Sequence, residues 1–107
     1  MDILLLRNQA CHMWEKQLEI LNNVLKENSM AIIPKVVIIS SDADAAQHGF
    51  IGSPTIQING QDIVKNARQP EKYSMHGCRL YVYNGEVYEY APKELIIEIF
   101  KKHGVIL

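Results

Sequence analysis

The chain has 107 residues, of which 48% are hydrophobic, and its 11 basic and 12 acidic side chains leave a formal net charge of −1. This length suits one compact core and is too short for two ordinary domains, so we expect residues 1–107 to form a single domain. Neither sign of charge gathers into a long block, which argues against nucleic-acid binding. The first apolar run is much shorter than a signal peptide or membrane span, and we predict a cytoplasmic protein that does not associate with a membrane.

The predicted elements alternate between strands and helices in the first half of the chain. Residues 3–6 form a short apolar run that is typical of a buried strand. Residues 13–27 carry apolar side chains at helical spacing and predict the first helix. Residues 35–39 are rich in β-branched side chains and predict a second buried strand. Residues 42–48 begin with a residue type that is favoured at helix N-caps, and they are followed by Gly49, a residue type that often ends helices. This pattern predicts a second, short helix.

The second half of the chain is predicted to contain three strands and one helix. The strands span residues 55–59, 78–83 and 86–90, and the helix runs from Pro92 to near Gly104. The order of elements implies an α/β domain with a mixed sheet, in which the first two strands are parallel through right-handed crossovers. The later strands are expected to be antiparallel, and the helices to cover both faces.

The stretch QHGFIGSPTIQING, residues 47–60, contains a proline immediately before a strand pattern. It is similar to the segment of the thioredoxin family that leads through a helix, a glycine and a cis-proline into the third strand. The chain resembles a thioredoxin-fold protein over nearly its full length. The resemblance implies a cis peptide bond between Ser53 and Pro54. The cis form of an X-Pro bond costs little free energy relative to the trans form, so the fold can impose it. It also implies that the bend exposes the Ser53 backbone to a bound chain, so both residues are candidate substrate-binding residues.

The sequence Cys11-His12-Met13-Trp14 stands where thioredoxins carry their Cys-x-x-Cys motif. The first cysteine of that motif is present, and Trp14 replaces the second. Unpaired N–H groups at a helix start favour a thiolate, so Cys11 is a candidate catalytic nucleophile whose pKa is predicted to lie below that of free cysteine. His12 could stabilise that thiolate or contact the substrate. The alternatives are that Cys11 is a small core residue and that His12 is an uninvolved surface residue.

The chain has two cysteines, which are too few for a secreted disulfide framework, so both are expected to be free thiols. Cys78 is therefore the second candidate for thiol chemistry. Its segment HGCRLY resembles part of small bacterial thioredoxin-like proteins that are sometimes grouped with alkylmercury lyases. Cys78 could resolve a mixed disulfide formed on Cys11, or it could be a buried strand thiol. The polar stretch between Gly60 and Cys78 is long enough to return Cys78 to the Cys11 end of the sheet. Nothing in its residues compels that return, and we expect the two cysteines to stay apart.

Two pairs of residues also raise the question of a metal site: Cys11 with His12, and His76 with Cys78. They supply two thiols and two imidazoles, which zinc prefers in a tetrahedral arrangement. The usual spacing within each ligand pair is missing. We therefore expect neither a metal nor another cofactor.

These observations favour a thiol-dependent redox protein that acts on a disulfide or another soft electrophile through Cys11. A protein disulfide or a small thiol such as glutathione is the expected partner. One alternative is a non-catalytic binding module that keeps the thioredoxin fold without its chemistry. Another is the handling of mercury or an organomercurial, which the resemblance around Cys78 implies.

Overall fold

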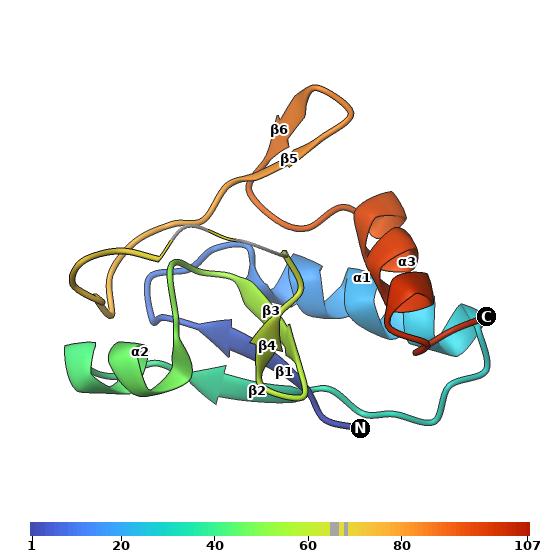
Figure 1. Cartoon of the computed structure of the whole chain (residues 1–107), viewed down its shortest axis with the longest axis horizontal. Coiled ribbons are helices and arrows are strands. Elements are labelled where there is room, and N and C mark those ends of the chain that lie inside the picture. Colours follow the sequence, from blue (N-terminus) through green and yellow to red (C-terminus); the bar gives the residue numbers. More distant parts are fainter. Residues whose placement is uncertain (65–66, 68) are drawn as a thin grey trace.

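The computed structural model describes residues 1–64, 67 and 69–107 (Figure 1). In chain order, the elements of this part are β1 (Ile3–Arg7), α1 (Trp14–Glu27), β2 (Lys35–Ile38), α2 (Asp42–His48), β3 (Thr55–Ile58), β4 (Gln61–Asp62), β5 (Tyr81–Tyr83), β6 (Glu86–Tyr88) and α3 (Lys93–Lys102). None of the helices within these described ranges is long and apolar enough to span a bilayer.

The main sheet has the strand order β2-β1-β3-β4. β1 and β2 are parallel and are joined through α1, while β3 is antiparallel to both β1 and β4. This arrangement confirms the predicted α/β class with a mixed sheet. Asn59 and Gly60 connect β3 to β4 with φ angles of 51° and 81°. Positive φ at both central residues is typical of a type I′ hairpin turn, which Asn-Gly favours.

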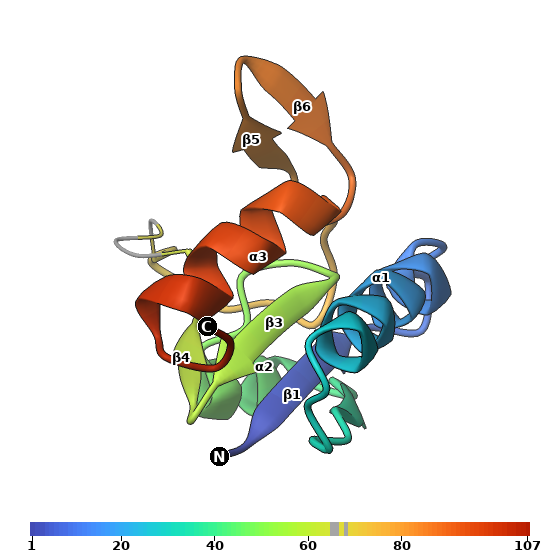
Figure 2. The same ribbon diagram turned by 90° about the vertical axis from the view of Figure 1, so that its right-hand side faces the viewer.

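The helices cover both faces of the sheet, as predicted. Since strand side chains alternate between faces, Ile3 and Leu5 of β1 point into the main core, and Leu6 points into a second, smaller one. α1 and α3 close the main core, and α2 closes the smaller one (Figure 2). The buried members of the smaller core are Leu6, Ile39, Ala45 and Phe50.

The prediction for the fourth strand was wrong. Residues 78–83 were expected to join the sheet. The strand that pairs with β3 on the side away from β1 is instead β4, which follows β3 directly in the chain. The tight turn at Asn59-Gly60 lets the chain reverse at once, so the next residues take the free edge of β3. β5 instead pairs with β6 in a separate hairpin that projects away from the sheet (Figure 1).

The helix predictions were close to the observed bounds. α2 begins and ends where predicted, with the Ser41 hydroxyl accepting a hydrogen bond from the Asp44 N–H and with Gly49 in the left-handed region. α1 begins at Trp14, one residue later than predicted, and its N-cap residue Met13 provides no side-chain cap.

Gly52 lies where two segments far apart in the sequence approach closely. Its φ is +147°, and a Cβ atom at this position would lie 3.0 Å from the Arg79 Cβ and 3.1 Å from the Arg79 nitrogen. Only glycine fits this geometry easily, because the backbone conformation is unfavourable for other residues and the space is already filled.

We expect Gly52→Ala to lower the free energy of unfolding more than Gly85→Ala does. Gly85 also has a positive φ, +79°, but a Cβ atom added there would meet nothing within 4 Å, so it controls for the backbone term. The difference should be about 1–3 kcal/mol, the usual cost of overpacking. Urea denaturation of both variants measures it, and equal losses would show that the approach of Arg79 to Gly52 is not tight.

Candidate functional site

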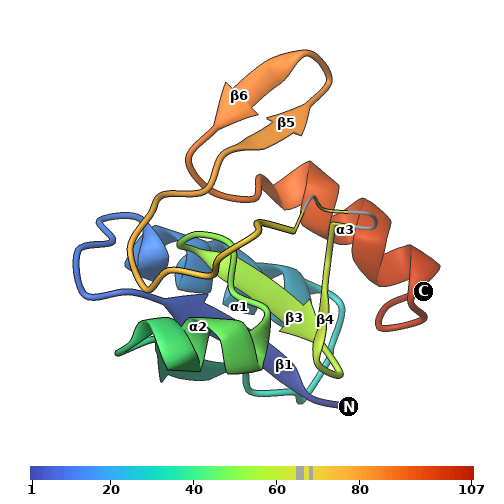
Figure 3. The same cartoon turned by 60° about the vertical axis from the view of Figure 1, so that its left-hand side comes forward.

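A short extended segment, residues 77–79, returns to the start of β3 and pairs with Ser53, two residues before that strand; we call this segment the strap. The Ser53 N–H donates a hydrogen bond to the Gly77 carbonyl at 3.2 Å, and the Arg79 N–H donates one to the Ser53 carbonyl at 3.0 Å. These two bonds make a parallel bridge between Ser53 and Cys78. Figure 3 shows the chain before β5 passing the start of β3, near the loop between β1 and α1.

The peptide bond between Ser53 and Pro54 is cis, as the resemblance implied. The expectation that this bend leaves the Ser53 backbone open to a bound chain was wrong. Ser53 is 3% exposed, and the strap uses both its N–H and its carbonyl group. Buried backbone groups require hydrogen-bond partners, and here the protein supplies them itself.

Asn8, the residue after β1, connects the strap to the Cys11 loop. Its backbone N–H donates to the Ser53 hydroxyl at 3.3 Å, and its side-chain Nδ2 donates to the Gly77 carbonyl at 3.0 Å. Its carbonyl accepts a hydrogen bond from the Cys11 N–H at 3.4 Å. Asn8 was not among the predicted site residues. The available signal was a polar side chain directly after a buried strand, at the end of the sheet where Cys11 lies.

Both cysteines lie at this end of the sheet, since Cys78 forms the bridge to Ser53 and the Cys11 N–H bonds to the Asn8 carbonyl. The expectation that the two thiols stay too far apart to pair stays a prediction. Both are free thiols; Cys11 is half-buried and Cys78 is exposed. Cys11 precedes the N-cap of α1 by two residues, and His12 beside it is exposed. The reactivity of the two thiols and the role of His12 stay predictions.

Trp14, at the position of the missing second motif cysteine, is the first residue of α1 and is half-buried. The guanidinium of Arg7, the last residue of β1, stacks over its ring with 4.3 Å between the guanidinium carbon and the ring centroid. This cation–π contact links the two ends of the loop that carries Cys11. Trp14 therefore fixes the start of α1 against the end of β1.

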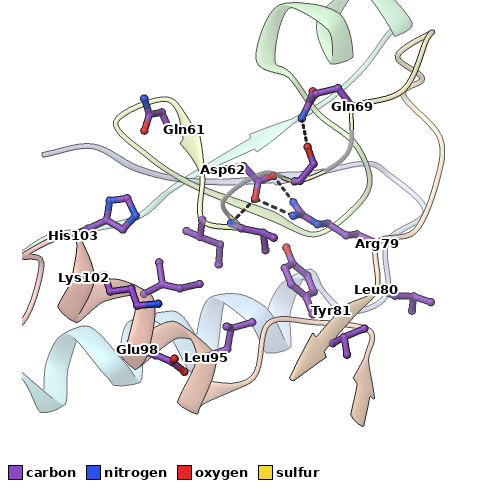
Figure 4. A pocket seen from close by; sticks show the side chains of 15 residues that line it. Gln61, Asp62, Gln69, Arg79, Leu80, Tyr81, Leu95, Glu98, Lys102 and His103 are labelled. Atoms are coloured by element: carbon purple, nitrogen blue, oxygen red, sulfur yellow. Dashed lines mark hydrogen bonds and ion pairs between the residues drawn. The ribbon is translucent and has the colours of Figure 1, made fainter. Parts of the chain in front are cut away.

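A buried polar network holds the strap in place (Figure 4). Arg79 is 7% exposed, and its guanidinium donates two hydrogen bonds to the Asp62 carboxylate of β4, at 2.5 and 2.9 Å. It donates a third to the Thr55 hydroxyl at 3.1 Å and lies 4.7 Å from the centroid of the Tyr81 ring. Planar two-point contacts of this kind fix geometry as well as contributing energy.

Tyr81 completes this network. Its hydroxyl donates to the Pro54 carbonyl at 2.6 Å. Of the two residues that form the cis bond, Ser53 therefore contacts the strap and Pro54 contacts Tyr81, two residues after the strap. Burial raises the pKa of Tyr81 well above its ordinary value, and the nearby Arg79 charge offsets part of that increase. Tyr81 is therefore a neutral hydrogen-bond donor throughout the physiological range.

The described part of the chain also contains a groove. It has a volume of about 1030 Å³ and runs between β4, residues 79–82 and α3. Asp62, Arg79 and Tyr81 line it, but neither cysteine does (Figure 4). Among the residues described, no group of three or more histidine, cysteine or acidic side chains is arranged to hold a metal ion.

The fold and the site together define a small α/β domain with two free thiols at one end of a mixed sheet. The chain belongs to the family described as "Domain of unknown function (DUF2703)", whose profile matches residues 4–99. A search of curated proteins and a search of solved structures each returned no match.

We expect Asp62→Asn to lower the free energy of unfolding by about 3–5 kcal/mol, because it leaves the buried Arg79 charge without its partner. Glu27→Gln is the matched control. It removes one partner of the Glu27–Lys93 pair, in which the side chains are 53% and 43% exposed, and should cost no more than about 1 kcal/mol. Chemical denaturation of both variants checks the expectation. Similar small losses would contradict the claim that the Arg79–Asp62 pair holds the strap.

Proposed function

We propose that this protein is a thiol-dependent redox protein of the thioredoxin-like type, with Cys11 as its nucleophile and Cys78 as its resolving thiol. The strand order, the helices on both faces and the cis bond before β3 support the thioredoxin-like assignment. The observation that carries the proposal is the pairing of the strap with Ser53, which brings Cys78 to the Cys11 end of the sheet. In this proposal Cys78 takes the resolving role that the second motif cysteine has in thioredoxins.

The proposed reaction has two exchange steps. The Cys11 thiolate attacks one sulfur of a substrate disulfide, the disulfide bond breaks, and the other substrate sulfur leaves as a thiolate. The Cys78 thiolate then attacks the Cys11 sulfur of the mixed disulfide and releases the second substrate thiol. The substrate disulfide is thereby reduced to two thiols, and the protein is oxidised to a Cys11–Cys78 disulfide.

A small thiol such as glutathione would complete the cycle by reducing the protein disulfide while being oxidised itself. A reducing cytoplasm would supply such a thiol, which agrees with the predicted location. Features of the local structure support Cys11 as the first nucleophile. Its N–H is held by the Asn8 carbonyl, and the α1 N-cap residue gives the N–H groups of the first helical turn no side-chain acceptor. Such donors favour a thiolate near them.

We expect Cys78→Ser to accumulate a covalent adduct that the parent protein resolves. The reduced protein is mixed with excess glutathione disulfide, quenched with acid, and analysed by intact mass spectrometry. The parent protein should end about 2 mass units lighter, because disulfide formation removes two hydrogens. Cys78→Ser should end with one glutathionyl group, mapped by peptide analysis to Cys11.

Cys11→Ser is the matched control and should remain largely unmodified under the same conditions, because its exposed Cys78 lacks the proposed activation. Equal modification of Cys11 and Cys78 in the two single variants, or no modification in either, would contradict the redox proposal. Either result would favour the alternative of a binding module that keeps the fold without the chemistry.

A further inference from the structure

The strap occupies the position that an extended substrate would need. Ser53 lies two residues before β3, at the end of the sheet where Cys11 lies, and Asn8 contacts both Ser53 and Cys11. An extended polypeptide that continued the sheet at Ser53 would bond to the N–H and the carbonyl of that residue. Both groups already bond to Gly77 and Arg79 of the same chain.

The strap is fixed by contacts that a competing peptide would have to break. Release of Arg79 from β3 would disrupt its two hydrogen bonds to Asp62 and its hydrogen bond to Thr55. It would also leave a nearly buried carboxylate and guanidinium without their partners, which is strongly unfavourable. At the other end of the strap, the Gly77 carbonyl is held by the Asn8 side chain as well as by Ser53.

We infer that the strap is a permanent internal replacement for a bound peptide, so that the substrates of Cys11 are low-molecular-weight disulfides and not disulfides in extended polypeptides. This inference rests on the proposed function. A small disulfide needs access to the Cys11 sulfur but no pairing with the sheet. Cys11 is half-buried, so some of its surface is open to such a molecule. The step is the exchange described above: the Cys11 sulfur bonds to one substrate sulfur, and the other leaves as a thiolate.

The test compares two substrates at equal disulfide concentration. Reduced protein reacts with glutathione disulfide or with insulin under pseudo-first-order conditions, and intact mass spectrometry follows the loss of free Cys11. We expect the rate constant for glutathione disulfide to be at least roughly tenfold higher, since two backbone hydrogen bonds that would position a peptide are unavailable. A rate with insulin equal to or higher than the rate with glutathione disulfide overturns the inference while leaving the redox proposal intact. No reaction of Cys11 with either substrate contradicts the redox proposal itself.

Variants that weaken the strap test the cause of this selectivity. Asp62→Asn removes the partner of Arg79, and Tyr81→Phe removes the hydrogen bond to the Pro54 carbonyl while leaving the ion pair in place. Circular dichroism at the assay temperature establishes which variants are folded. In a folded variant we expect the insulin rate to rise by roughly fivefold or more, while the glutathione disulfide rate changes by less than about twofold. If the insulin rate stays at the parent value in both folded variants, the strap is not what excludes polypeptides.

Discussion

The pairing of the strap with Ser53 is the interaction on which the site depends. Two backbone hydrogen bonds connect segments that lie about a quarter of the chain apart, and they place Cys78 at the end of the sheet that also carries Cys11. Without this pairing, Cys78 would lie in a long polar connection with no fixed relation to the first thiol. The polar contacts of Asn8, Arg79 and Tyr81 all act on this pairing or on residues next to it.

The buried Arg79–Asp62 pair is better understood as fixing register than as a source of stability. Burying two charges costs free energy that their attraction only partly repays, so such a pair contributes little compared with an apolar contact of the same size. A shift of the strap by one residue would remove Arg79 from its partner and place Leu80, which is 60% exposed, in a polar environment. The close approach at Gly52 enforces the same register, because only a particular backbone position of Arg79 fits against it.

Local signals in the sequence predicted much of the fold. The Asn59-Gly60 turn and the limits of α2 with Ser41 and Gly49 follow from neighbouring residues. The cis bond was implied by the resemblance to the thioredoxin segment. The return of the strap could not be predicted in this way, since it depends on partners far away in the chain. Asp62 and Arg79 are 17 residues apart, and Asn8 and Gly77 are 69 apart. Residues 78–80 lie outside the main sheet, although their pattern resembles a strand, because β4 occupies the edge of β3.

Amide hydrogen exchange measured by NMR tests the strap most directly. In the parallel bridge, the N–H groups of Ser53 and Arg79 are bonded, whereas Cys78 is exposed and its N–H points away from Ser53. We expect slow exchange at Ser53 and Arg79, comparable to the amides of β3, and fast exchange at Cys78, next to Arg79. Fast exchange at all three amides would show that the strap is not paired with Ser53 in solution and would contradict its role in positioning Cys78.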